Sequence, residues 1–197
     1  MNKINKGVPI MINGVEYHLP DSKAGKGHYA GALDTIQGQF DAMLSYHCKM
    51  LVVRVDLKMK YFTESNKMLS DFWDALKRPF ASRLNQNRFG YIWCREMGES
   101  GGHHYHVVLL LDGNKHQTSY KIIEIVEEIW MRWGQPKPYT PKNCYYMVQR
   151  GDTEAYLDAF NRASYLAKVA TKEGLPPRKN KYNGSRLKPK VDLGVAA

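Results

Sequence analysis

The chain has 197 residues, of which 43% are hydrophobic, so it can bury the core of one domain and still leave length for extensions. Its formal charge of +10 and sequence pI near 9.4 favour a polyanionic partner such as nucleic acid, although many small basic proteins have no such partner. No apolar run is long enough to span a bilayer, and no phosphate-binding GxxxxGK[ST] loop occurs, so we expect neither a membrane protein nor an NTPase motor.

The cysteine pattern argues against a cysteine-rich zinc site. Cys48, Cys94 and Cys144 are widely spaced, and no Cys-x-x-Cys pair is present. Because the sequence shows no secretory signal peptide, we expect free thiols in a reducing cytoplasm.

The first 47 residues read as an extension made of a hairpin and a helix. Residues 8–12 and 15–19 flank Asn13-Gly14, a strong signal for a two-residue hairpin turn. Residues 29–48 carry apolar side chains at a spacing of three and four, which predicts a helix.

A strand and a helix follow. Residues 50–57 are rich in branched side chains and predict a strand. Its residues Val53, Val55 and Leu57 share one face that would meet helices, whereas Arg54 and Asp56 share the other, which faces either a cleft or solvent. Residues 62–84 predict a helix that Pro79 kinks or splits.

A predicted β-hairpin carries the most informative residues. One strand covers residues 91–97, a glycine-bearing turn follows, and the second strand covers residues 104–111. Alternation puts His104 and His106 on one face and Tyr105 on the other, with Glu96 across the turn. Neutral imidazole and carboxylate suit Mn²⁺ or Mg²⁺, so we expect a divalent metal site here, the alternative being a pair of structural histidines.

The last elements complete a recognisable order. Residues 118–133 predict an amphipathic helix, residues 143–149 a strand, and Asp152 caps a final helix over residues 153–172. The order β-α-β-β-α-β predicts an α+β, ferredoxin-like (RRM-like) antiparallel sheet with helices on one face. The histidines would lie on the other, open face.

The final helix and the C-terminal arm supply a second set of polar residues. The predicted helix puts three polar residues on one face: Tyr165, Lys168 and Lys172. A lysine there could favour the tyrosine anion or hold a phosphate. The alternative is that the tyrosine and its lysine simply lie at the border between core and solvent. Beyond Gly174 we expect a flexible basic arm. The candidate DNA-binding residues are Arg54, Lys172, Arg178, Lys179, Lys181, Arg186 and Lys188.

Taken together, these motifs resemble the HUH endonuclease superfamily. A His-hydrophobic-His strand precedes a Tyr-x-x-Lys helix, the order of the Rep class, and Asn161 stands where two-tyrosine initiators carry their second tyrosine. The chain is most similar to the single-tyrosine replication initiators of filamentous phages and related prophages. These also share an aromatic-Gly-Ser tail, here Tyr182–Arg186, and the resemblance covers roughly residues 48–190.

The resemblance implies a role for each motif residue. His104 and His106 would hold the metal, Tyr165 would be the nucleophile, and Lys168 would orient the scissile phosphate or stabilise the phenolate. Glu96 is the third ligand suggested by the hairpin itself, with Glu99, Asp56 or a tail residue as alternatives. His103 lies on the wrong face unless a bulge brings it in.

The implied activity is that of a sequence-specific single-stranded DNA nickase and ligase that initiates rolling-circle replication through a 5′-phosphotyrosine intermediate. Residues 48–173 would form the nuclease domain, between the extension of residues 1–47 and the basic arm of residues 174–197. The expected partners are single-stranded DNA at a replication origin, beside a hairpin, and a separate helicase and polymerase in the cytoplasm of a bacterial host.

Two alternatives remain. One is a single-tyrosine transposase of the same superfamily, although such enzymes usually carry a glutamine near the tyrosine, where Lys168 stands here. The other is a non-catalytic RRM-like domain whose open face binds bases through Tyr105, Tyr145 or Tyr146.

Overall fold

A computed structural model of the chain describes residues 4–5, 10–12, 15–17, 27–97, 103–169 and 180–191. The helices are α1 (Ala30–Tyr46), α2 (Lys67–Leu84), α3 (Tyr120–Arg132), α4 (Thr153–Ser164) and the short 3-10 helix η1 (Tyr165–Ala167). The main strands are β5 (Lys49–Lys58), β6 (Gly90–Met97), β7 (His103–Asp112), β8 (Tyr145–Gln149) and β9 (Tyr182–Gly184). In the described ranges, none of the helices combines the length and apolarity that crossing a membrane requires.

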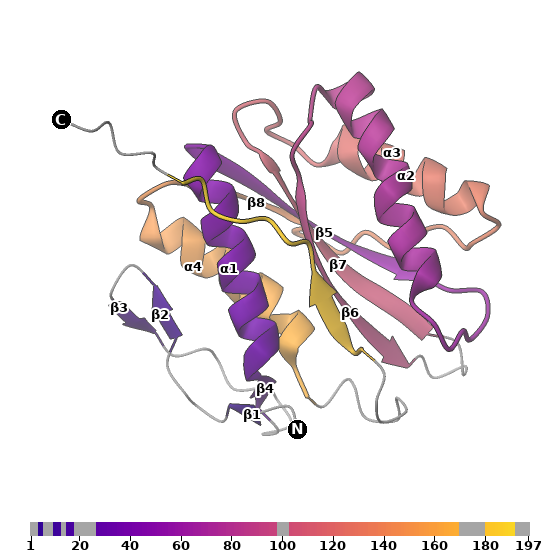
Figure 1. Cartoon of the computed structure of the whole chain (residues 1–197), viewed down its shortest axis with the longest axis horizontal. Coiled ribbons are helices and arrows are strands. Elements are labelled where there is room, and N and C mark those ends of the chain that lie inside the picture. The colour runs from indigo at the N-terminus through magenta and orange to yellow at the C-terminus, as the bar shows by residue number, and fades with distance from the viewer. Residues whose placement is uncertain are drawn as a thin grey trace.

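The central sheet confirms the predicted α+β, ferredoxin-like class. Its five antiparallel strands lie in the order β8-β5-β7-β6-β9. If the four strands before β9 are numbered 1 to 4 in chain order, from β5 to β8, their spatial order is 4-1-3-2. This is the order that a β-α-β-β-α-β chain adopts in the ferredoxin-like fold. Helices α2 and α3 lie together on one side of the sheet (Figure 1).

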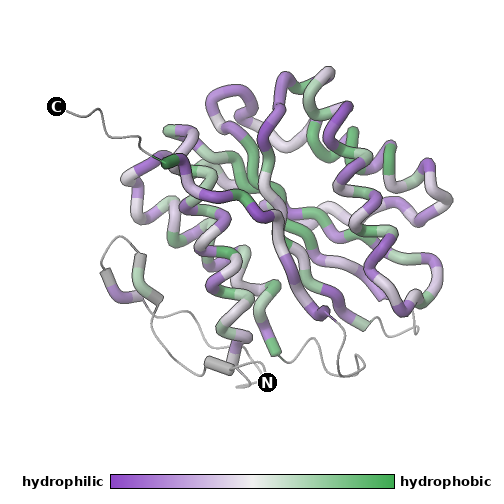
Figure 2. The backbone as a smooth tube through the Cα atoms, in the orientation of Figure 1, coloured by the Kyte–Doolittle hydropathy of each residue, from purple (hydrophilic) through white to green (hydrophobic). Residues whose placement is uncertain are grey.

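The face under α2 and α3 is built by alternation along the strands. Leu51 and the predicted Val53, Val55 and Leu57, at alternate positions of β5, are buried against these helices. Burial of each such side chain contributes about 1.5–3 kcal/mol before the entropy of ordering it is subtracted. The backbone tube shows the hydrophobic positions gathered along the strands (Figure 2).

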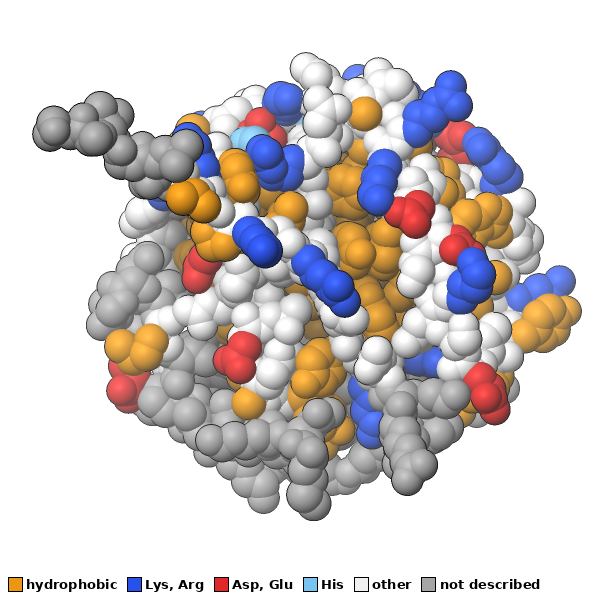
Figure 3. Space-filling view, in the orientation of Figure 1, with side chains coloured by type: hydrophobic (Ala, Val, Ile, Leu, Met, Phe, Trp, Pro, Cys, Tyr) orange, Lys and Arg blue, Asp and Glu red, His pale blue; other side chains and the backbone are white. Residues whose placement is uncertain are grey.

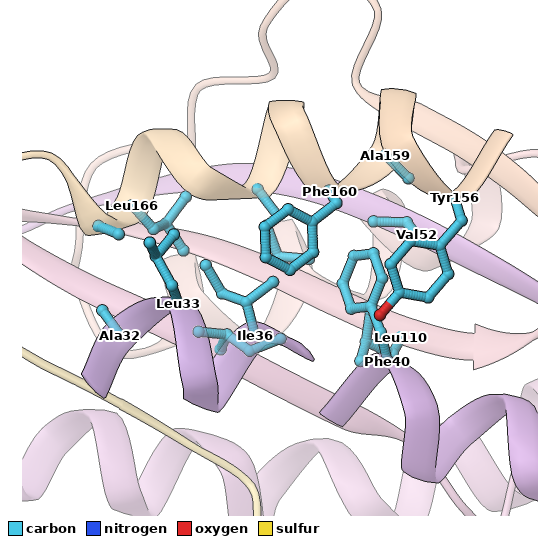
Figure 4. Close-up of a cluster of buried hydrophobic side chains, with 14 of the residues drawn as sticks. Ala32, Leu33, Ile36, Phe40, Val52, Leu110, Tyr156, Ala159, Phe160 and Leu166 are labelled. Atoms are coloured by element: carbon cyan, nitrogen blue, oxygen red, sulfur yellow. The ribbon is translucent and has the colours of Figure 1, made fainter. Parts of the chain in front are cut away.

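The opposite face is open over a smaller area than predicted, because α1 and α4 cover one end of it. Val52 of β5 and Leu110 of β7 pack there against Phe40 of α1 and Phe160 of α4 (Figure 4). Toward the other end of β5, the residues on this face change from apolar to polar, beginning at Arg54. This face of the sheet therefore carries a second apolar core at one end and a polar cluster at the other, where Arg54 and Asp56 are themselves buried.

Helix α2 corrects one expectation. It begins at Lys67 rather than Phe62, and it runs through Pro79 to Leu84 without being split. Proline costs the helix one backbone hydrogen bond. Leu76 and Phe80, which flank it, are completely buried, and their packing offsets that loss.

The N-terminal hairpin is confirmed in a shorter form. Strands β2 (Ile10–Ile12) and β3 (Val15–Tyr17) pair antiparallel with Ile12 opposite Val15. The turn residues Asn13 and Gly14 lie outside the described residues. Two further short strands, β1 (Ile4–Asn5) and β4 (His28–Tyr29), pair just before α1. As predicted, all three cysteines are free thiols.

The C-terminal segment is not the flexible arm that its composition suggested, at least over residues 180–191. Strand β9 pairs with β6, and the chain then crosses α1, where the Gln39 amide donates to the Leu187 carbonyl at 3.2 Å. Figure 3 shows Lys and Arg side chains along this segment, with hydrophobic side chains visible between it and α2. The segment is thus part of the folded domain.

Candidate active site

The candidate site lies where β5, β7 and β6 run side by side at the polar end of the sheet. The strand register places His104 between Lys58 and Glu96, and His106 between Asp56 and Cys94. Residues directly opposite each other on antiparallel strands point to the same face. The polar side chains of three strands therefore gather in two adjacent rows.

Glu96, His104 and His106 form a group suited to a metal ion. One ligand atom from each lies within 4.8 Å of the others. Glu96 Oε2 is 2.9 Å from His106 Nε2 and 3.8 Å from His104 Nε2. Three ligand atoms at about 2.1 Å from one ion lie at similar mutual distances, so the donor set fits Mn²⁺ or Mg²⁺. The hairpin prediction that put Glu96 beside the histidines is confirmed as geometry.

Asp56 holds the imidazole of His106 from the side away from Glu96. Its Oδ1 atom is 2.7 Å from Nδ1 of His106. The Arg54 guanidinium also comes within 3.3 Å of that nitrogen, but a guanidinium only donates, so we assign the Nδ1 proton to the bond with Asp56. This arrangement leaves Nε2 as the nitrogen of His106 that would face a metal. Asp56, one of the alternative third ligands, is therefore placed as an orienting residue.

The electrostatics of the two histidines differ. Burial lowers the pKa of His106, but the hydrogen bonds and charges of Asp56 and Glu96 more than offset this and raise it above its ordinary value of 6.5. The pKa of His104 is lowered, first by burial and then by the charge of His106. Protons therefore compete with a metal more strongly at His106 than at His104.

Tyr165 contacts this group through His106. Its ring meets the His106 ring edge to face, with centroids 5.6 Å apart. The Arg54 guanidinium carbon and the Lys168 ammonium each lie 4.6 Å from the centroid of the Tyr165 ring. Burial is the main cause that raises the pKa of Tyr165, the Glu96 charge adds to it, and the Arg54 charge opposes it.

The local structure around Tyr165 differs from the predicted helix over residues 153–172. Asp152 does cap α4, by accepting from Ala155 N at 3.0 Å, but α4 ends at Ser164. Tyr165 begins a single 3-10 turn, and Lys168 follows in extended conformation. Lys168 is held there by an antiparallel bridge to His28, so the two predicted residues meet through a turn rather than along a helix face.

A comparison with known families covers all of these residues. The family described as the YagK/YfjJ C-terminal domain matches residues 13–181. The chain belongs to the YagK/YfjJ C-terminal domain family. The family consists of prophage-associated proteins. Searches of curated proteins and of solved structures gave no match.

The remaining predicted residues of this YagK/YfjJ-family chain lie in three places. Arg54 is buried inside the candidate site, with 6% of its surface exposed. On the C-terminal segment, Arg186 and Lys188 are exposed, whereas Lys181 is half-buried and its carbonyl accepts from Arg95 N at 2.8 Å. The candidates outside the described residues are Lys172, Arg178, Lys179 and the alternative ligand Glu99.

His103 stays on the face given by alternation. The pairing of β6 and β7 continues without a bulge to Met97 and His103. His103 is buried among Arg95, Phe62 and Tyr105, on the α2 side of the sheet. It therefore takes no part in the metal group.

The aromatic residues considered for a plain nucleic-acid-binding domain do not lie at the polar end of the sheet in this family member. Tyr105 is fully buried under α2, and Tyr145 lies opposite Val53 on that same face. Tyr146 packs against the second core, at the end covered by α1 and α4. Tyr139, which was not among the predicted residues, is 52% exposed and pairs with Asp56 at the edge of the site. Its proline-rich surroundings gave no strand signal that could have placed it.

Proposed function

We propose that this chain is a metal-dependent endonuclease of the HUH superfamily, Rep class. In this proposal it nicks and rejoins single-stranded DNA at a replication origin and so initiates rolling-circle replication, with helicase and polymerase supplied separately. The observation that carries the proposal is the contact between the Tyr165 ring and His106, because a tyrosine beside a Glu-His-His group suited to a metal is what such a reaction needs. Family membership agrees with a prophage origin.

Each residue of the site has a task in such a reaction. Glu96, His104 and His106 would hold Mn²⁺ or Mg²⁺, which polarises the scissile phosphate when bound. The Tyr165 oxygen attacks phosphorus as its proton is lost. The bond from phosphorus to the 3′ oxygen breaks, and that oxygen takes up a proton, leaving a 5′-phosphotyrosine and a free 3′-hydroxyl. Attack by a 3′-hydroxyl on the phosphotyrosine reverses these steps and rejoins a strand.

Two cations beside the Tyr165 ring support this chemistry. A protonated phenol is a weak nucleophile, and burial makes the Tyr165 proton harder to remove. Arg54 and Lys168 both lie over the ring, where their charges stabilise the phenolate and the negative charge that builds up on the phosphate. Lys168 thus has the environment for the role that the HUH resemblance implies.

The test is the covalent adduct. Purified protein is incubated with Mn²⁺ and single-stranded oligonucleotides that tile the DNA flanking its gene, and adducts are detected on a denaturing gel. Tyr165→Phe should eliminate the adduct, because the attacking oxygen is gone while the ring is kept. Tyr120→Phe is the matched control, since Tyr120 is 76% exposed on α3 and should leave the adduct unchanged.

Peptide mapping of the adduct decides the assignment. A phosphotyrosyl bond at any residue other than Tyr165 overturns the choice of nucleophile. Absence of any adduct from the wild-type protein counts against the endonuclease as a whole. If the protein joins the two ends of a transposable element in the same assay, the result favours the transposase instead.

A further inference from the structure

Tyr139 is an exposed aromatic side chain on the same face as the metal group. The backbones of Tyr139 and Asp56 exchange two hydrogen bonds of 2.9 Å, so the two residues form an antiparallel bridge. Residues paired in this way point to the same face. The register places Tyr139, Asp56 and His106 in one row across the sheet. Two strand spacings of about 4.8 Å separate Tyr139 from His106 by about 10 Å.

Lys58 supplies a positive charge between Tyr139 and the metal group. It is exposed, it lies two residues along β5 from Asp56 and so shares its face, and it is directly opposite His104. Its ammonium lies 6.0 Å from the centroid of the Tyr139 ring. Lys58 makes no ion pair with any residue that the structure describes, whereas nearby Lys137 is paired with Glu127 at 3.1 Å. Its charge is therefore available to a ligand.

The segment that presents Tyr139 is stiff. Pro136, Pro138 and Pro141 flank it, and proline fixes the backbone angle φ. The side chain of Gln135 accepts a hydrogen bond of 3.0 Å from the Lys60 backbone, which ties the segment to the end of β5. A ring held in place before binding loses little conformational entropy when a ligand stacks on it.

We propose that Tyr139 and Lys58 form a binding platform for single-stranded DNA beside the metal group. Tyr139 stacks on one base, and Lys58 binds the backbone phosphate between that base and His104. Successive stacked nucleotides rise about 3.4 Å, so this base lies within about three nucleotides of the phosphate at the metal group. The proposal rests on the proposed function, because it names where that substrate strand lies.

The test is binding without cleavage. The affinity of the full chain for a fluorescein-labelled oligodeoxythymidylate of about ten nucleotides is measured by anisotropy in EDTA. Loss of a stacked base weakens binding by about 5- to 150-fold, and this is the effect expected for Tyr139→Ala. Tyr139→Phe keeps the ring and should bind like wild type. Tyr120→Ala removes an exposed tyrosine from α3, on the other side of the sheet, and should have no effect.

The contribution of the Lys58 charge is measured from the salt dependence of binding. Lys58→Ala should reduce the slope of log K against log salt by about 0.7, the value for one phosphate contact on a single strand. Lys121→Ala is the control, because Lys121 is an exposed lysine on α3. Lys58→Arg should keep the wild-type slope.

The outcomes separate this proposal from the proposed function. If Tyr139→Ala binds as tightly as Tyr120→Ala, or Lys58→Ala keeps the wild-type slope, the platform is wrong even when Tyr165 forms its adduct. If the platform variants lose binding but wild type forms no adduct, the platform stands and the endonuclease falls. Should Tyr139→Ala lose its fold, as judged by circular dichroism, Tyr139→Leu carries the same expected loss.

Discussion

Asp56 offers a direct test of how the metal group is organised. Its carboxylate lies 2.7 Å from the Nδ1 atom of His106 and so orients the ring whose other nitrogen would bind metal. Removing such an orienting partner typically weakens metal affinity 10- to 100-fold, that is, by about 1.4–2.7 kcal/mol. We expect Asp56→Asn at the low end, because an amide oxygen can still accept the proton, and Asp56→Ala at the high end.

The loss can be measured as thermal stabilisation by Mn²⁺. At a Mn²⁺ concentration of about 100 times the wild-type Kd, binding stabilises the fold by about 2.7 kcal/mol. After a 100-fold loss of affinity, the same concentration contributes only about 0.4 kcal/mol. For a domain of this size the Mn²⁺-induced rise in Tm should fall from about 5–11 °C to about 1–2 °C. Calorimetric titration gives Kd directly and should agree.

Asp112→Asn is the matched control. Oδ2 of Asp112 lies 3.2 Å from Nδ1 of His47, so Asp112 belongs to an aspartate–histidine pair at the far end of β7 from the metal group. Its removal should change the Tm of the metal-free protein but not the rise caused by Mn²⁺. An unchanged Mn²⁺ affinity in Asp56→Ala would refute the orienting role, and equal losses in both variants would show a general effect on stability.

Two further substitutions test the site and the fold. The double variant His104→Ala/His106→Ala should lose detectable cleavage. It should keep most of its DNA affinity, because such affinity comes mainly from phosphate contacts. Nicking at the wild-type rate would show that the metal group takes no part in the mechanism. Gly184→Ala puts a Cβ atom 2.9 Å from Thr35 Cγ2 and 3.1 Å from the Tyr91 carbonyl, so it should destabilise the protein by about 1–3 kcal/mol in a denaturant titration. In Gly38→Ala the new Cβ atom meets nothing within 4 Å outside its own helix backbone, so the free energy of unfolding should stay the same or rise. Equal effects of Gly184→Ala and Gly38→Ala would mean that β9 does not pack as described.

The arrangement of the metal group could be predicted from the sequence because a strand has a period of two. Once the glycine-bearing turn defined the hairpin, His104 and His106 had to share a face, and Glu96 had to lie across from them. The same alternation placed Asp56 on the polar side of β5. These inferences needed only neighbouring strands, and the structure bears them out.

Contacts between distant segments could not be predicted in this way. The bridge between Lys168 and His28 ends the last helix early, yet nothing in residues 164–168 resembles a helix stop. The covering of the second sheet face by α1 and α4 is visible in the sequence. Residues 107–111 are apolar at every position, and such a run is typical of a strand buried on both faces. Strand β9 left none, because three residues in a basic segment carry no periodicity.

The pairing of β9 with β6 also affects the order in which the protein folds during synthesis. The hydrogen bond from Tyr91 N to Ser185 Oγ joins residues 94 positions apart, and the ribosome adds about 5–20 residues per second. After β6 is synthesised, roughly 5–19 s therefore pass before β9, the partner of its outer edge, is synthesised. During that interval β6 has an unpaired strand edge that another nascent chain or a chaperone can bind. We therefore expect folding yield in cells to depend on how quickly residues 98–185 are translated.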